Sequence, residues 1–251
     1  MKLPERLARI AAYVKPGAIV ADIGTDHALL PVYLIKQGIS PRVIAGELHP
    51  GPLEAARSTV AFYGLEKQIQ VREGDGLQVL QPAEAETVVI AGMGGAKIKD
   101  ILEASPAVLE RVKRLILQPL GGSGILRNWL LSNGWLLVDE DLVFEGGHFY
   151  EIIVAEPGSP GGGERKEGGS LGNPDSDLES RLHLEFGPRL LEKRHPLLVP
   201  FLEKQVREME NVVRALERAR TPAARQMQRE WIRKIEFFKK VIACQLDAKS
   251  S

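Results

Sequence analysis

Acidic residues and glycines follow three short apolar runs, and their spacing favours binding of an adenosine-containing ligand. Asp22, Gly24 and Asp26 lie within Asp-Ile-Gly-Thr-Asp-His, Glu47 ends Val-Ile-Ala-Gly-Glu, and Asp75 lies within Glu-Gly-Asp-Gly. In an open α/β sheet, ligands bind beyond the carboxyl ends of the strands. A carboxylate after the second strand can accept hydrogen bonds from both ribose hydroxyls. A carboxylate after the third strand can accept one from an adenine amino group.

The first of these turns discriminates between cofactors. A dinucleotide site would need G-x-G-x-x-G there, so that two phosphates approach the backbone. This chain has Gly24 alone, and Asp26 stands where the second glycine would be. That carboxylate would repel a pyrophosphate but suits a ligand with a positive centre and an amine. S-adenosylmethionine carries a sulfonium and an α-ammonium group, so we expect it as the cofactor and disfavour NAD.

The elements that must position these residues alternate between short β-rich runs and helical stretches. Helical stretches such as Pro52–Tyr63 and Ile98–Leu109 separate the first five runs, which are largely apolar, as strands buried on both faces of a parallel sheet must be. The last two runs are joined only by residues 145–148 and are predicted to pair antiparallel. The pattern predicts a class I (Rossmann-like) methyltransferase domain. The predicted strands are Ala18–Ile23, Arg42–Leu48, Ile69–Glu73, Thr87–Ala91, Arg114–Gln118, Trp135–Phe144 and Phe149–Ala155.

Three regions divide the chain. Residues 1–156 form the predicted catalytic domain, 157–177 a Gly/Pro-rich linker, and 178–251 a helical domain. In the last region, apolar residues recur every three or four positions on two segments separated by Thr221–Pro222, which predicts an antiparallel coiled-coil hairpin. The apolar positions are Leu202, Val206, Met209, Val213 and Leu216, then Trp231, Ile235, Phe238 and Ile242.

The neutral total charge conceals an uneven distribution. Residues 178–251 contain 16 Lys/Arg and 10 Asp/Glu, a net charge of +6. Residues 1–177 contain the other 17 Lys/Arg and 23 Asp/Glu, a net charge of −6. A basic tail of this kind indicates nucleic-acid contact, although a solvated helix face would look similar. The arginines that share helix faces and could contact RNA are Arg207, Arg214 and Arg218, followed by Arg225, Arg229 and Arg233.

Other features narrow the class of protein. The single cysteine, Cys244, excludes an internal disulfide or a cysteine-based zinc site, and we expect it to be packed. The N-terminus lacks the apolar core of a signal peptide, and no run approaches the roughly 20 apolar residues of a membrane span. We therefore expect a cytoplasmic protein without membrane or metal partners, and favour a monomer.

Several of these segments resemble, in order, the bacterial tRNA (adenine-22-N1)-methyltransferase family. The resemblance runs from Leu3 to about Pro157 and resumes at Phe186-Gly-Pro-Arg-Leu-Leu. It implies a Rossmann-like domain, a coiled-coil domain that helps to hold tRNA, and S-adenosylmethionine as methyl donor. The segments that carry it are VADIGTDHALLP, AGEL followed by GPLEAA, VREGDGL, VVIAGMGG, LILQP and YEIIVAEP.

The resemblance also assigns site residues. Two features depart from the family: Leu120 stands where Asn usually follows Gln-Pro, and the Gly-rich insertion of 157–177 is longer. The residues expected at the cofactor are Asp22, Gly24, Asp26, His27, Glu47, Leu48, Asp75, Gly76, Gly92, Met93 and Gly94.

Methylation of adenine N1 needs positioning more than base catalysis, because N1 already carries a lone pair. Asp26 is the candidate for stabilising the cationic product, with His27 as an orienting or proton-handling partner; cofactor binding alone for Asp26, and a helix-terminus or packing role for His27, remain open. Three other functions also remain open. These are a methyltransferase acting on a small molecule or protein, a non-catalytic binding module, and an NAD-dependent oxidoreductase.

Overall fold

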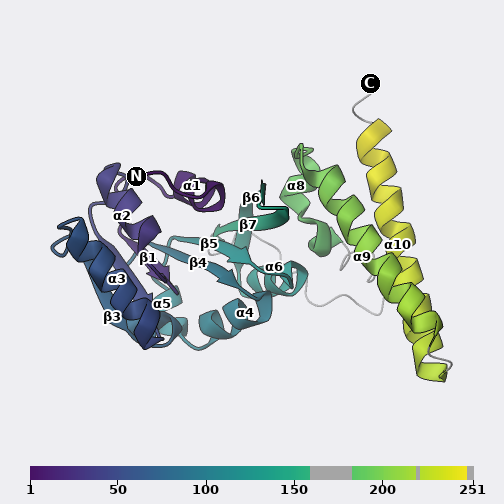
Figure 1. Ribbon diagram of the computed structural model, residues 1–251, viewed down its shortest axis with the longest axis horizontal. Helices are drawn as coiled ribbons and strands as arrows, with labels where there is room; N and C mark the ends of the chain where they lie inside the picture. Colours follow the sequence, from purple (N-terminus) through teal and green to yellow (C-terminus); the bar gives the residue numbers. More distant parts are fainter. Residues whose placement is uncertain (159–182, 219–220, 248–251) are drawn as a thin grey trace.

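Seven strands form one mixed sheet in the order β3-β2-β1-β4-β5-β7-β6. The computed structural model describes residues 1–158, 183–218 and 221–247 (Figure 1). The first five strands are parallel, and β7 runs antiparallel between β5 and β6. All seven predicted strands are confirmed, with ends that shift by a few residues. The strands are β1 (Val20–Ile23), β2 (Val43–Glu47), β3 (Ile69–Glu73), β4 (Thr87–Met93), β5 (Arg114–Pro119), β6 (Trp135–Glu145) and β7 (His148–Pro157).

Helices cover both faces of the sheet, which explains why its central strands are apolar throughout. One core lies beneath α4, α5 and α6, and the other beneath α1, α2 and α3. Both exclude water from β1 and β4, whose residues Val20–Ile23 and Thr87–Ile90 are buried. The elements are α1 (Glu5–Ala12), α2 (Leu29–Lys36), α3 (Pro50–Phe62), η1 (Gly76–Val79), α4 (Gly95–Glu103), α5 (Pro106–Leu109) and α6 (Ser123–Ser132).

The single helix predicted over Ile98–Leu109 is wrong. The structure has two helices there, α4 and α5, separated at Ala104 and Ser105. Pro106 lacks a backbone N–H and disfavours the helical region for the residue before it, so Ser105 adopts φ −137° and ψ 57°. Leu102 and Val108 still reach the same core from both sides of the break.

The helical region contains α8 (Pro188–Glu192), α9 (Leu198–Glu217) and α10 (Pro222–Asp247). The last two pack side by side as the predicted hairpin (Figure 1), and α10 begins at Pro222, directly after Thr221 of the predicted break. Leu202, Val206 and Met209 of the predicted apolar stripe are buried, and Phe238 packs with them. The expectation that Cys244 is packed is wrong, because it is exposed. The predicted linker lies outside the described residues from position 159, and Pro157 still belongs to β7.

A buried ion cluster joins the catalytic domain to the segment that leads into α8. Arg127 of α6 is fully buried, pairs with Glu140 of β6, and lies 2.6 Å from the Glu151 carboxylate of β7. The same guanidinium donates to the Leu184 carbonyl over 2.8 Å. The Arg189 backbone N–H donates to the second oxygen of Glu140, also over 2.8 Å. Both domains therefore share one desolvated charge network.

A second contact ties α1, β6 and the segment before α9 together. The buried carboxylate of Asp141 lies 2.7 Å from His195 Nε2 and accepts a 3.0 Å hydrogen bond from the Tyr13 hydroxyl. Burial alone would raise the pKa of Asp141, but the partners His195 and Tyr13, with Arg9, hold it below its usual range. The charged form is therefore favoured at this junction.

Within the described ranges, no helix combines the length and apolarity that crossing a bilayer requires. The same part of the chain brings no three His, Cys, Asp or Glu side chains into an arrangement that could hold a metal ion.

Candidate active site

Two adjoining cavities lie at the carboxyl edge of the sheet and meet at Gly24. The first, of about 230 Å³, is lined by Glu47 and by Asp75 at the start of η1. The second, of about 400 Å³, is lined by Asp22 and Asp26. The predicted residues that line one or both are Asp22, Gly24, Asp26, His27, Glu47, Leu48, Asp75, Gly76, Gly92 and Met93. Gly94 is not among the lining residues of either cavity and instead precedes α4.

Gly24 is required by both backbone conformation and space. Its φ of +73° favours glycine, and a Cβ added there would lie 2.3 Å from Met93 Cε. A larger residue would displace the Met93 side chain, which lines the first cavity. The glycine therefore preserves the shape of the wall where the two cavities meet.

Glu47 ends β2 and its carboxylate is held by backbone donors. It is buried, and its Oε1 accepts from the N–H groups of Leu48 and His49 at 2.9 and 3.0 Å. Its Oε2 accepts from the Asp26 N–H at 3.2 Å, which links the second strand end to the first. A carboxylate has about four acceptor positions, so one remains for a ligand beyond these three bonds, and shared acceptance allows a second.

Asp22 at the end of β1 is buried and accepts a 2.7 Å hydrogen bond from the Thr25 hydroxyl. Burial raises the pKa of Asp22 from 3.8 to about 6, an effect that Thr25 and the positive charge of Arg6 only partly offset. A partner cation in the second cavity would recover the cost of ionising this carboxyl group.

The affinity for S-adenosylmethionine should consequently rise with pH. Above about pH 6 the Asp22 carboxylate is charged and can pair with the α-ammonium group, whereas below it the pairing is lost. In the absence of ligand, the stability of the folded protein changes with pH in the opposite direction. Because folding raises the pKa of Asp22, the stability that this group contributes is present below pH 3.8 and is lost as the pH rises through about 6. Calorimetric titrations from about pH 5 to pH 7.5 should show affinity rising and then levelling. The Asp22→Asn variant should bind S-adenosylmethionine more weakly, and its affinity should not vary with pH. If the pH dependence persisted in that variant, another titrating group would be responsible for it.

Asp26 and His27, the predicted catalytic pair, occupy the turn after β1. Asp26 has φ 52° and its carboxylate lies 3.6 Å from His27 Nε2. Both side chains are more than half exposed, at 65% and 58%, and face the second cavity. They are therefore accessible to a substrate that approaches the cofactor from solvent.

The sequence did not indicate that Arg6 belongs to the site. Arg6 lines the second cavity, and its guanidinium lies 5.4 Å from the centroid of the Tyr150 ring. It donates a 2.8 Å hydrogen bond to the fully buried Gln118, which also accepts from the Gly92 N–H over 3.2 Å. Only the long-range meeting of α1 with the sheet brings Arg6 here, so no local motif could have revealed it. Leu120, at the family's usual Asn position, also lines this cavity and is 56% exposed.

The donor set fits S-adenosylmethionine. Glu47 and Asp75 in the first cavity offer acceptors for ribose hydroxyls and the adenine amino group. Asp22 and Arg6 in the second offer opposite charges for the ammonium and carboxylate of the methionine part. The residues that line the two cavities thus match the two halves of the cofactor.

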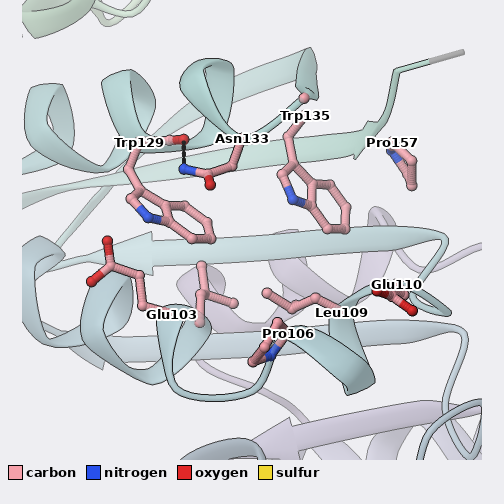
Figure 2. Close-up of a pocket in the computed structure, with 10 residues that line it drawn as sticks. Glu103, Pro106, Leu109, Glu110, Trp129, Asn133, Trp135 and Pro157 are labelled. Carbon is pink, nitrogen blue, oxygen red and sulfur yellow. Dashed lines mark hydrogen bonds between the residues drawn. The ribbon is translucent and has the colours of Figure 1, made fainter. Parts of the chain in front are cut away.

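A third cavity, of about 350 Å³, lies between the ends of α4 and α6, where Trp129 and Trp135 face Pro106 and Leu109 (Figure 2). α4 begins beside the cofactor cavities at Gly95 and ends at Glu103, so this cavity is near the opposite edge of the sheet. It holds none of the predicted site residues.

Fold and site together define a class I S-adenosylmethionine-dependent methyltransferase, and a family described as methyltransferase domain matches residues 3–153. The tRNA (adenine(22)-N(1))-methyltransferase of Bacillus subtilis (strain 168) is 45% identical over 158 residues, which span 63% of this chain and 66% of that protein. The crystal structure of the B. subtilis tRNA methyltransferase TrmK superposes with a TM-score of 0.81 at 34% identity, covering 96% of this chain and 99% of the other. A Streptococcus pneumoniae structure in complex with S-adenosyl-L-methionine gives 0.79 at 34% identity, covering 96% and 100%. The chain belongs to the tRNA (adenine-22-N1)-methyltransferase family.

Proposed function

We propose that this protein transfers a methyl group from S-adenosylmethionine to N1 of adenine 22 in tRNA. The observation that supports the proposal is the pair of cavities that meet at Gly24, whose lining carboxylates are available to accept hydrogen bonds from ribose hydroxyls and to pair with an ammonium group. The names of the B. subtilis relatives support the choice of tRNA and of the target atom. When bound, the cofactor supplies an electrophilic methyl group.

The residues of the chain would act by positioning. Adenine N1 attacks through its lone pair, so the site need only align the base with the methyl group and stabilise the positive charge that develops on it. Tyr150, Leu120 and Gly92 border the second cavity and would shape the space for the base. Asp26 carries the nearby exposed carboxylate suited to the cationic product, and His27 would orient it.

Asp26→Asn should lower turnover more than it weakens cofactor binding. The amide keeps the size of the side chain, and the backbone bond from position 26 to Glu47 remains, but the charge opposite the product is lost. Because Asp26 is exposed, we expect kcat to fall by about tenfold, which is less than the roughly 100- to 1,000-fold cost of removing a stabiliser from a water-excluded site. Single-turnover rates and cofactor titrations on the same samples separate the two quantities. Equal losses in both would make Asp26 a binding residue only.

The six predicted RNA-contacting arginines belong to the hairpin, and all are exposed. Arg207 and Arg214 lie on α9, Arg218 directly follows it, and Arg225, Arg229 and Arg233 lie on α10. Phosphate contacts from such a surface release counterions, so the tRNA affinity should fall steeply as salt increases. We infer that residues 178–251 hold the tRNA while residues 1–156 carry out the transfer.

Reversing Arg214 and Arg218 to Glu should weaken tRNA binding and flatten its salt dependence, by about one unit of slope for each phosphate that the hairpin no longer neutralises. The hairpin should remain folded because both side chains are exposed, outside the buried stripe. A matched control reverses Lys67 and Arg111, which are also exposed but precede β3 and β5 at the other edge of the sheet. Salt titrations of tRNA binding compare the three proteins. Identical slopes for all of them would place RNA recognition elsewhere.

The decisive experiment incubates the protein with methyl-labelled S-adenosylmethionine and bulk tRNA, followed by nucleoside analysis. Label in 1-methyladenosine, absent when adenine 22 is replaced in a transcribed tRNA, is the expected result. Label in another nucleoside, or only in small molecules or protein, would overturn the proposal. A tRNA substrate also supports the predicted cytoplasmic location.

A further inference from the structure

A fourth cavity, of about 320 Å³, lies between the catalytic domain and the helical hairpin. Gly121, Gly122 and Ser123 form one wall, at the start of α6. The opposite wall is formed by side chains of α9 and α10, among them Phe201 and Trp231. Glu185, from the segment before α8, also lines the space, and its carboxylate lies 3.3 Å from the Lys234 ammonium of α10. We call this space the interdomain cleft.

The interdomain cleft shares a loop with the methyl-transfer cavity. Leu120 lines that cavity, and the next two residues, Gly121 and Gly122, line the cleft. Backbone hydrogen bonds hold the loop against the end of β4 and the start of α4, from the Leu120 N–H to Met93 O at 2.7 Å and from the Gly95 N–H to Gly121 O at 2.8 Å. Adjacent Cα atoms are about 3.8 Å apart, so the two spaces are separated by only a few ångströms of backbone.

The lining combines aromatic surface with hydrogen-bond acceptors. Trp231 is partly exposed and has the Lys234 ammonium 5.5 Å from its ring centroid. Three carboxylates line the cleft: Glu151, which is paired with Arg127, Glu185, which is paired with Lys234, and Glu208, which is exposed. The Glu208 carboxylate repels phosphate groups and can accept hydrogen bonds from N–H donors. An aromatic face stacks on a nucleobase of any identity.

We propose that the interdomain cleft receives a second unpaired nucleobase of the tRNA substrate, with Trp231 as the stacking surface and Glu208 as an acceptor for its amino or imino N–H groups. The proposal rests on the proposed function, because the same RNA strand must place its target adenine in the neighbouring cavity. The walls come from both domains, so the base would be positioned relative to the methyl group and the hairpin at once.

Trp231→Leu tests the stacking surface in the full-length protein. We expect tRNA binding to weaken by about tenfold, the scale of losing one base–aromatic stack, with affinity for S-adenosylmethionine unchanged. Trp231→Phe should retain most of the affinity. Phe62→Leu is the matched control, because Phe62 on α3 is 83% exposed and far from the cleft lining. Wild-type tRNA affinity in folded Trp231→Leu would overturn the proposal.

A second pair of variants does not depend on the aromatic packing. Glu208→Gln and Glu203→Gln each remove one negative charge from an exposed position on α9, but only Glu208 lines the cleft. Both substitutions would reduce the electrostatic repulsion of the tRNA backbone equally. The two variants therefore differ only in that Glu208→Gln removes a hydrogen-bond acceptor from the cleft. We expect kcat/KM for tRNA to fall severalfold in Glu208→Gln and to hold or rise in Glu203→Gln. Equal gains in both would show that Glu208 merely repels phosphate, and would overturn the assignment.

Methyl transfer to tRNA by the wild-type protein is measured in the same series. Absence of transfer by the wild-type protein would overturn the proposed function, and this inference with it. Normal transfer by wild type together with unaffected cleft variants would overturn the cleft alone.

Discussion

Replacing Glu47 by alanine is expected to weaken binding of S-adenosylmethionine by about 100-fold or more. The buried Glu47 carboxylate lines the first cavity and is our predicted acceptor for the two ribose hydroxyls, and each hydrogen bond to a charged group contributes about 1.5–3 kcal/mol. The substitution also leaves the N–H groups of Asp26, Leu48 and His49 without their acceptor, which loosens the turn that borders the methionine side. Isothermal titration with the cofactor and with its demethylated product measures the effect.

Glu73→Ala provides the matched control for this result. Glu73 ends β3 in register with Glu47, but its side chain is exposed and does not line the cofactor cavities. Its removal should leave the cofactor affinity unchanged. If Glu47→Ala bound the cofactor as tightly as this control, the carboxylate would be a structural cap on its strand and not a ribose ligand.

Arg127→Ala is expected to reduce the free energy of unfolding by about 3–5 kcal/mol, because it leaves buried carboxylates without their counter-charge. Glu140 is completely buried and Glu151 nearly so, at 12% side-chain exposure. Burial raises the pKa of Glu140 even with Arg127 in place, so ionisation there is already costly. Urea denaturation at neutral pH measures the change.

Two further variants distinguish lost charge from lost volume. Arg127→Met fills much of the space but supplies no charge, so it should be destabilised nearly as strongly as Arg127→Ala. Adding Glu140→Gln to Arg127→Met removes one of the two unpaired charges and should restore part of the loss. Lys99→Ala, at an exposed ion pair with Glu103, should change stability far less. If the Arg127 cluster contributed little to stability, the three Arg127 variants would have the same free energy of unfolding as Lys99→Ala.

Local sequence patterns predicted the strands and the hairpin because each pattern reports on its own element. Val20–Ile23 and Val43–Glu47 are buried on both faces, and apolar runs of this kind are confirmed as parallel strands. The insertion of β7 between β5 and β6 is a long-range pairing that no run of residues encodes. Pro106 could have predicted the break between α4 and α5, but the apolar spacing continues on both sides of Pro106 and concealed the break.

Some residues that matter for the site and its support could likewise be predicted from the sequence, and others could not. Acidic residues at strand ends could be located in advance because parallel strands bring their carboxyl ends to one edge. Arg6 and Arg127 could not be located in advance, because their roles depend on partners more than ten residues away in the sequence. The partner of Arg6 is Gln118, and the partners of Arg127 are Glu140 and Glu151. The interdomain cleft likewise exists only through the packing of two domains. The roles of Asp26 and His27, although both face the cavity, stay predictions.

The two buried contacts at Arg127 and Asp141 also bear on how a substrate is selected. They join the segments that lead into α8 and α9 to α6 and β6 through buried charged groups, so the distance between the exposed arginines and the methyl-transfer cavity is set by the fold. With the tRNA held by that hairpin as proposed, only an RNA whose helix and target adenine are separated by the matching length and angle can occupy both places. The enzyme would then measure the shape of its substrate rather than read its nucleotide sequence, and a fragment containing the adenine alone would enter the cavity without alignment.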